Sequence, residues 1–255
     1  MHLRIQEYPM CYVIGIRIPK KQTIKIGNSE LDLDPIDIPV QSGFTYESWP
    51  VLYKEDAKIS STQNIIKPSL MHWELIPHWV QNEKELIESR KKYTTLNIKA
   101  ETILSNKVAQ NSIHSNRCLV LASHFFEWQQ VQKEKYPYCI SVNENSVFYI
   151  AGVWNTWTNQ NTGEIKKSFG IVTTQANPLM AKIHNSKKRM PTILEADTAN
   201  AWLNENLNSA QIEELAKYQL AESKMSAYTV AKNFLQSSNP CEKMEYKIFT
   251  PQTLF

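Results

Sequence analysis

The sequence predicts a single α+β domain built around a curved, barrel-like and mainly antiparallel β-sheet, with helices flanking it. Many short runs of β-branched and aromatic residues follow one another closely, which is typical of antiparallel strands. Charged, helix-favouring segments are few in comparison. No repeat, low-complexity linker or change in composition divides the 255 residues, so we expect one domain.

The first predicted strand covers residues 11–18, and residues 22–26 alternate in polarity as its hairpin partner would. Residues 28–50 contain Asp, Pro and Ser without a clear period and are predicted to form a loop. A further strand is predicted at 70–76. Residues 82–92 are charged and favour a helix.

Residues 101–113 place apolar side chains near one face and predict a second helix. Five strand-like runs then occupy 117–122, 124–131, 136–142, 147–157 and 168–174. The second and third of these are predicted to pair as a hairpin. A short helix is expected at 178–183.

In the C-terminal part, Asp197 is predicted to cap a helix over 198–206, and 209–221 form another helix. The last predicted strand covers 245–250. The chain is therefore expected to end its sheet close to its C-terminus.

Composition is ordinary for a soluble globular protein, with 42% hydrophobic residues and a net charge of +3. No apolar run reaches the roughly 20 residues of a membrane-spanning helix, and no secretion signal is evident. The cysteines lack CxxC spacing, which disfavours a zinc site or disulfide framework and favours a reducing compartment. We expect a cytoplasmic monomer, nucleoid-associated if bacterial, that contacts no membrane and needs no metal or cofactor.

Two residues are candidates for proton transfer. Glu127 lies between Phe126 and Trp128, where aromatic neighbours would partly desolvate the carboxyl group and suit it to shuttling protons. The alternative is a strand residue that faces solvent, opposite the two aromatic side chains. His184 precedes a basic run that favours its neutral, proton-accepting form, although a surface histidine is the simpler interpretation.

Binding residues are suggested by charge and aromaticity. Lys187, Lys188 and Arg189 form a short basic run, which can hold a phosphate backbone even when net charge is small, or can simply be a solvated loop. Trp73 and Trp79 belong either to the core or to a surface on which unpaired bases stack. Asn97 either orients a polar ligand or caps a turn.

Several motifs, in the same order along residues 10–203, resemble the SOS response-associated peptidase family, the abasic-site processing proteins. MHWELIPHW resembles the family element WGLIPxW, and NIKAET resembles NARAET. The remaining matches are the RCL and FFEW runs, the PY and AGVW strands, the segment from Phe169 to His184, and RMPTIL: these occupy 117–128, 137–138, 151–154, 169–184 and 189–194.

The resemblance implies the fold described above and a substrate, an abasic site in single-stranded DNA. It also implies that a cysteine exposed by removal of the preceding methionine forms a reversible thiazolidine crosslink with the sugar. The matching residue is Cys11 after Met10, and Asn97, Glu127 and His184 match the other active-site residues.

The chemistry requires a terminal cysteine. An α-amine titrates at about 8, so its neutral form can attack the aldehyde of the open sugar and give an imine. The adjacent thiol can then close the ring, because both nucleophiles lie on neighbouring atoms. Glu127 would shuttle protons, His184 would assist ring opening and Asn97 would hold the amine or the sugar. Phosphates would be bound by the basic run 187–189.

The sequence departs from the family pattern at several positions. Cys11 follows ten residues, so 1–10 are expected to be a leader or a mis-assigned start, and 11–255 the processing domain. Tyr12 and Val13 replace the Gly and Arg that usually follow the cysteine, and Lys99 replaces an arginine, which weakens bidentate phosphate binding. Glu74 replaces a glycine.

Two other functions stay open on the sequence alone. A Cys–His peptidase would use Cys11 as nucleophile and His184 as base, and would not need a terminal cysteine. A non-catalytic single-stranded DNA-binding protein would result if Cys11 remained blocked.

Overall fold

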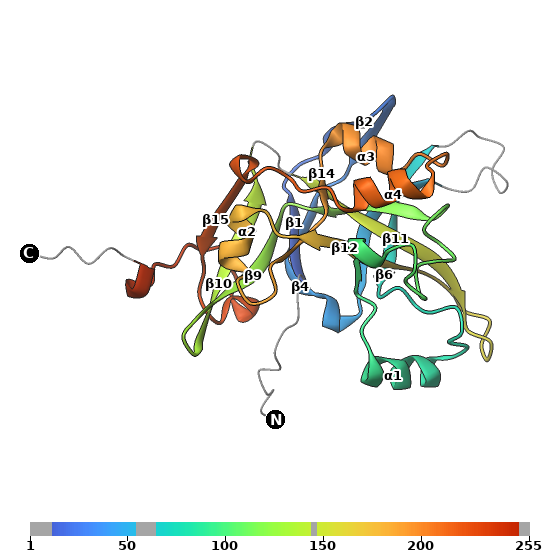
Figure 1. The fold of residues 1–255 in the computed structure, drawn as a ribbon, viewed down its shortest axis with the longest axis horizontal. Helices are drawn as coiled ribbons and strands as arrows, with labels where there is room; N and C mark the ends of the chain where they lie inside the picture. Colours follow the sequence, from blue (N-terminus) through green and yellow to red (C-terminus); the bar gives the residue numbers. More distant parts are fainter. Residues whose placement is uncertain (1–11, 55–64, 144–146, 250–255) are drawn as a thin grey trace, which may run out of the picture.

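The computed structural model describes residues 12–54, 65–143 and 147–249 and contains two main sheets and a small hairpin (Figure 1). The larger sheet comprises β5 (Ser48–Lys54), β6 (Ile66–Trp73), β7 (Asn97–Lys99), β8 (Arg117–Ala122), β11 (Phe148–Thr158), β12 (Ile165–Gln175), β13 (Arg189–Pro191) and β14 (Ile193–Leu194). The five-stranded sheet comprises β1 (Val13–Ile18), β4 (Ile36–Ser42), β9 (His124–Val131), β10 (Glu134–Val142) and β15 (Met225–Thr229). The hairpin joins β2 (Gln22–Ile26) and β3 (Ser29–Leu33).

The larger sheet closes on itself as a five-stranded barrel. Its strands follow the order β12-β6-β5-β8-β11, and β11 pairs back onto β12. Within this ring only the β6–β12 pairing is parallel. The barrel confirms the predicted α+β fold class. Large aromatic side chains fill it: the rings of Trp73 and Phe169 stack with centroids 6.1 Å apart, and Trp49 lies beside Trp73.

The five-stranded sheet follows the order β15-β10-β9-β1-β4 and lies beside the barrel (Figure 1). Strand β1 lies between β9 and β4, and on β9 Val13 is opposite Phe126 and Gly15 is opposite His124. Gly15 is required there, because an added Cβ would lie 2.0 Å from His124 Nε2. The predicted hairpin of β9 and β10 is confirmed.

Four α-helices flank the sheets in the described part of the chain: α1 (Glu83–Lys92), α2 (Pro178–Ile183), α3 (Ala196–Trp202) and α4 (Ser209–Ala216). Helix α2 packs on β9, and α3 packs on β8 and β11. The buried Arg117 side chain ties α3 to the barrel by donating to the Trp202 carbonyl at 2.7 Å. None of the helices in the described ranges is long and apolar enough to cross a bilayer.

Several predicted elements were wrong. Residues 22–26 are a strand, but β2 pairs with β3 rather than with β1. The predicted loop 28–50 contains β3, β4 and the start of β5. Residues 101–113 form a short 3-10 helix (Ala100–Thr102) followed by successive turns, because Asn106 Oδ1 accepts from the backbone of Val108 and Ala109 and replaces helical hydrogen bonds.

The C-terminal predictions also need correction. Helix α3 begins at Ala196, so Glu195 occupies the cap position assigned to Asp197. Within 245–249 the chain forms a 3-10 turn (Lys247–Phe249) and no strand. The sheet instead gains β15, which the sequence did not predict.

Candidate functional site

Glu127 lies in β9 on the face of the sheet opposite its aromatic neighbours. Phe126 stacks on Phe234 with ring centroids 4.3 Å apart, and Trp128 lies 5.8 Å from the same ring. Because side chains alternate along a strand, Glu127 faces the other side. Only 2% of its surface is exposed, which excludes the solvent-facing alternative.

His184 is positioned by the end of helix α2. Asn177 caps the start of the helix: its side chain accepts from Met180 N at 2.9 Å, and Pro178 is the first helical residue. His184 caps its other end, directly after Ile183, and donates its backbone N–H to the Met180 carbonyl at 2.7 Å. The next residue, Asn185, bonds the backbone of Gln130 in β9 in both directions, at 2.8 and 3.0 Å.

This docking brings the two predicted proton-transfer residues together. His184 Nδ1 lies 4.0 Å from Glu127 Oε1, and His184 is 5% exposed, so the surface-histidine interpretation was wrong. His184 Nδ1 also lies 3.0 Å from the Arg189 carbonyl oxygen. A carbonyl can only accept, so Nδ1 carries the hydrogen, and in the neutral ring Nε2 is the nitrogen able to accept a proton.

Arg189 does not belong to an exposed basic patch. It is 9% exposed, and its Nη1 contacts Glu101 Oε1 at 2.5 Å while Nη2 donates to the Thr173 carbonyl at 2.5 Å. Partial burial would raise the pKa of Glu101, but the hydrogen bond and charge of Arg189 outweigh it, so that pKa lies below its ordinary value. The ion pair links the NIKAET and RMP segments across β12. No local pattern in the sequence predicts a contact between two residues this far apart in the chain.

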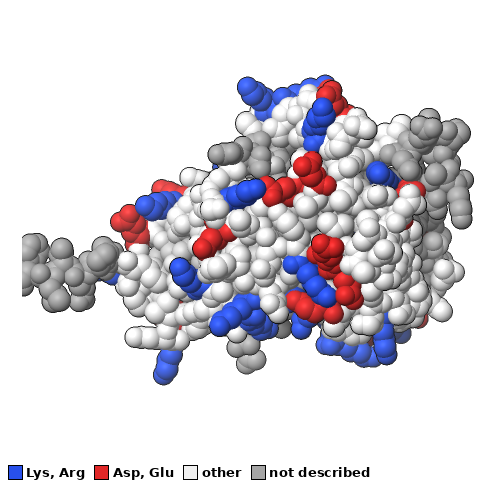
Figure 2. Space-filling view, turned by 45° about the horizontal axis from the view of Figure 1, so that its top comes forward, with Lys and Arg blue, Asp and Glu red and all other residues white. Residues whose placement is uncertain are grey.

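Lys187 and Lys188 are exposed, as is Lys99. Lys188 adopts a left-handed backbone conformation (φ 51°). Its N–H donates to the His184 carbonyl at 2.8 Å, and this hydrogen bond closes a tight turn after His184. Basic and acidic side chains interleave over the face seen in Figure 2, without a broad area of one sign. Phosphate binding by the lysines is therefore a hypothesis about these exposed side chains and does not rest on a broad basic area of this face.

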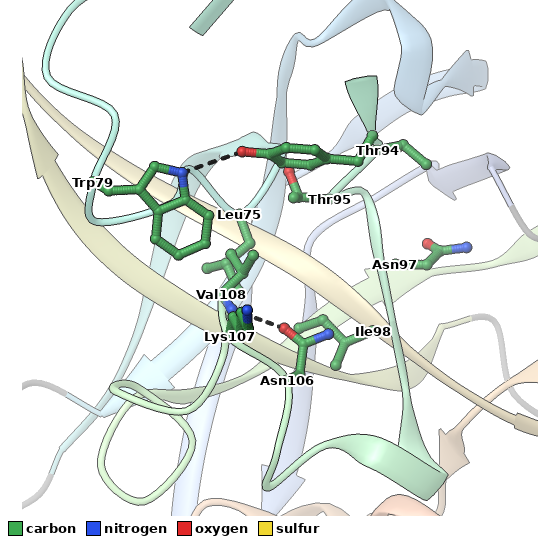
Figure 3. Close-up of a pocket in the computed structure, with 10 residues that line it drawn as sticks. Leu75, Trp79, Thr94, Thr95, Asn97, Ile98, Asn106, Lys107 and Val108 are labelled. Atoms are coloured by element: carbon green, nitrogen blue, oxygen red, sulfur yellow. Dashed lines mark hydrogen bonds between the residues drawn. The ribbon is translucent and has the colours of Figure 1, made fainter. Parts of the chain in front are cut away.

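Asn97 lines a pocket of about 310 Å³, together with Trp79, Tyr93, Asn106 and Lys107 (Figure 3). Trp79 is 43% exposed and its indole N–H donates to the Tyr93 hydroxyl at 3.2 Å. Asn97 begins β7, opposite Ile171 of β12. Trp79 can therefore reach a ligand in this pocket.

Trp73 cannot stack on DNA in this structure. It is fully buried in the barrel and donates its indole N–H to the Leu96 carbonyl at 3.2 Å, so it belongs to the core. The sequence could not distinguish it from Trp79, since both lie in the same aromatic motif.

Cys11 lies outside the described residues. Its neighbour Tyr12 is 4% exposed, and the Tyr12 carbonyl accepts from Gly43 N at 2.7 Å. Tyr12 directly precedes Val13, which pairs with Phe126, the neighbour of Glu127. In the described ranges, no group of three or more His, Cys, Asp or Glu side chains is arranged to hold a metal ion.

The fold and site together define a single-domain barrel protein with a buried carboxylate–imidazole pair beside its first strand. The profile of the family described as SOS response associated peptidase (SRAP) matches residues 39–236. The chain belongs to this family. The match includes Asn97, Glu127 and His184 and begins after Cys11.

Individual relatives agree with this assignment. The abasic site processing protein YoaM of Bacillus subtilis is 30% identical over 162 residues, covering 60% of this chain and 67% of the relative. The abasic site processing protein HMCES of Xenopus tropicalis is 31% identical over 170 residues, covering 59% of this chain and 48% of the relative. The match thus spans two thirds of the first protein and about half of the second.

Solved structures share the fold. A crystal structure of a protein from Bacteroides thetaiotaomicron superposes with a TM-score of 0.72 at 31% identity, covering 82% of this chain and 87% of that one. A protein from Bordetella bronchiseptica superposes with a TM-score of 0.63 at 17% identity, covering 87% of this chain and all of that one.

Proposed function

We propose that this protein processes abasic sites in single-stranded DNA by forming a reversible covalent crosslink through Cys11. The names of its relatives support abasic-site processing. The observation that carries the proposal is the register of β1 on β9. It holds Tyr12, one peptide bond from Cys11, next to the strand that bears Glu127, with His184 Nδ1 4.0 Å from that carboxyl group.

In the proposed reaction, the α-amine of Cys11 attacks the aldehyde carbon of the open abasic sugar. Loss of water gives an imine, and the Cys11 thiol then adds to the same carbon and forms a thiazolidine. Glu127 delivers the proton that the leaving oxygen needs. The buried setting keeps bulk water from replacing it in this role.

Release runs through the same atoms in the opposite order. Ring opening breaks the carbon–sulfur bond, and the departing thiolate must be protonated. Glu127 and His184 are the proposed proton relay: Nδ1 of His184 donates to the Arg189 carbonyl at 3.0 Å and lies 4.0 Å from the Glu127 carboxyl group. Asn97 holds the amine or the sugar, and Trp79, Lys99, Lys187 and Lys188 contact the DNA strand.

The reaction requires a free amine on Cys11, so we propose that residues 1–10 are absent from the active protein and that 11–255 form the processing domain. Two routes produce this N-terminus: initiation at Met10 followed by methionine removal, or hydrolysis of the Met10–Cys11 bond. The second would be the peptidase activity in the family name. Intact mass of protein purified from its native source distinguishes the routes; a fully active protein that retains Met1 contradicts both.

The crosslink itself is tested with chains that begin at residue 11. The wild-type chain should give an adduct with abasic single-stranded DNA that survives a denaturing gel. Cys11→Ala should give none, and Cys11→Ser at most an imine that borohydride can trap. Cys118→Ser is the matched control, because Cys118 is buried in the barrel and should not affect the adduct.

The same gels address the two alternative functions. A stable adduct in Cys11→Ala would show that the nucleophile lies elsewhere. Binding of abasic DNA without any adduct in the wild-type chain would favour a non-catalytic DNA-binding protein. Cleavage of added peptides without an adduct would favour a Cys–His peptidase.

A further inference from the structure

Two cysteines meet on the side of the five-stranded sheet that faces away from Glu127. Cys139 lies in β10 opposite Phe126 and is 2% exposed. Cys241, half-buried, lies in the segment after β15 and packs against the same apolar cluster, which contains Val13, Phe126, Cys139, Val230 and Phe234. Both thiols are free in this structure. The proposed crosslinking chemistry uses neither of them.

The surroundings make the two sulfurs unequal. The proximity of Cys139 in the same cluster is the main reason why the pKa of the Cys241 thiol is lowered; burial opposes this change, while the nearby His124 and the charge of Arg17 favour it. The proximity of Cys241, together with burial, raises the pKa of Cys139. Cys241 is also the more exposed residue of the two, so its thiol is the better placed to meet an oxidant from solution.

His124 is held firmly in this arrangement. Its Nε2 lies 2.8 Å from the Pro39 carbonyl and its Nδ1 2.8 Å from Ser123 Oγ, with Gly15 leaving room for the ring. Cys118 has no comparable surroundings. It is fully buried in the barrel, and burial alone raises its pKa. Cys118 is thus a matched unreactive thiol within the same chain.

We propose that Cys139 and Cys241 are a redox-active pair that closes a reversible intramolecular disulfide when the protein meets a peroxide. The Cys241 thiolate attacks one peroxide oxygen, the O–O bond breaks, and Cys241 becomes a sulfenic acid while hydroxide leaves. Cys139 sulfur then attacks Cys241 sulfur, and the sulfenic oxygen leaves as water. Two thiols and one hydrogen peroxide thus give one disulfide and two waters, and an added dithiol restores the thiols.

The bond would fix the C-terminal segment to the strands behind the candidate site. Between β15 and Cys241 the chain carries Phe234, which stacks on Phe126, the neighbour of Glu127 in β9. A disulfide would close a loop of roughly one hundred residues. Loops of this size lose much conformational entropy in the unfolded chain when closed, so the oxidised protein should be the more stable form.

The test uses the full chain in a Cys11→Ala background, so that the proposed nucleophile does not contribute and the result is independent of DNA processing. Reduced protein is treated with hydrogen peroxide, free thiols are alkylated, and peptides are mapped by mass. We expect one crosslinked species joining the Cys139 and Cys241 peptides, lighter by two hydrogen atoms and lost on treatment with dithiothreitol. Its formation should raise the Tm by about 5 °C.

Variants assign the roles. Cys139→Ser should stop at a Cys241 sulfenic acid that dimedone traps, Cys241→Ser should give no disulfide, and Cys118→Ser should behave as its parent. Crosslinks between chains, a disulfide that includes Cys118, or an unmodified Cys241 after peroxide treatment would each overturn the proposal.

Discussion

At the scale of single residues, Glu127 and His184 are withdrawn from solvent but not locked into a direct ion pair. Their 4.0 Å separation exceeds normal hydrogen-bond length, and the Arg189 carbonyl already occupies the His184 Nδ1 hydrogen. A carboxyl group held in this way can exchange a proton with a bound substrate without first breaking a strong bond to the histidine.

Replacement of these two residues should separate capture from release. Glu127→Gln keeps the shape of the side chain but cannot carry a proton, so we expect moderately slower crosslink formation and strongly slower release. His184→Ala should slow release with less effect on capture. Preformed adducts are chased with excess abasic DNA, and transfer is followed over hours. Wild-type release from both variants would contradict the proton relay.

The Glu101–Arg189 pair predicts a pH effect on stability. The pKa of Glu101 is lowered in the folded protein from its ordinary value of 4.5. The contribution of this ion pair to the free energy of unfolding is therefore fully present above the pKa that Glu101 has in the unfolded chain. It is lost as pH falls through the pKa that Glu101 has in the folded protein. Between pH 6 and pH 3 the free energy of unfolding, measured with urea, should fall more for the wild-type protein than for the Glu101→Gln variant. Glu214→Gln, an exposed residue in α4, is the control and should follow the wild type.

At the scale of elements, helix α1 is attached to the barrel by one buried charge. Glu74 is 2% exposed and accepts from Arg90 of α1, at 2.9 Å from Nε and 2.6 Å from Nη2. The Arg90 guanidinium also lies 3.8 Å from the centre of the Tyr46 ring. The motif that this segment resembles has glycine at the position of Glu74, and a glycine has no side chain that could accept these hydrogen bonds from Arg90.

Glu74→Ala should therefore destabilise the protein by about 3 kcal/mol, because it leaves Arg90 without its carboxylate partner in a largely buried setting. Urea unfolding followed by circular dichroism measures the change. Glu88→Ala provides the control on the same helix. Its pair with Lys91 is exposed, and the unfolding midpoint should not move.

The sequence predicts strands and helices correctly where the local residue pattern and the contacts in the folded protein favour the same structure. The bounds of β8, β9 and α2 were confirmed, because β-branched runs or a Pro-containing cap define them locally. Strand β4 was missed because it contains Pro39, which a strand tolerates only at an edge, and β4 is an edge of its sheet. Edge position is a property of the assembled sheet and cannot be read from the local sequence.

The candidate site shows the same limit. Glu127 and His184 were identified from their motifs, and the structure brings them together. The sequence left open whether Trp73 is buried and did not predict the pairing of Arg189 with Glu101, because both depend on contacts between distant parts of the chain. Asn97 and Trp79 stay predictions of function, although both line one pocket.

At the scale of the whole molecule, DNA affinity should depend on a few exposed lysines, since the net charge is only +3. Replacing Lys187 and Lys188 together with Ala should lower the slope of log affinity against log salt by about 1.4, from about 0.7 for each phosphate contact on single-stranded DNA. Fluorescence anisotropy at several salt concentrations measures the slope. The matched control replaces two other exposed lysines together with Ala: Lys20, which lies near β2, and Lys25, which lies within it. An unchanged slope in the first variant would remove these lysines from the DNA-binding surface.

Strand β12 closes the barrel, and its place late in the chain affects how the protein is made. On the ring, β6 has β12 as its second neighbour, so Ser168 pairs alongside His72 from a distant part of the chain. Until the ribosome has released β12, the nascent strands β5 and β6 have an open edge. Pairings of this range are slow to form, so folding should be limited by barrel closure after synthesis of most of the chain. During that interval the open edge is the part of the molecule most exposed to aggregation or to capture by a chaperone.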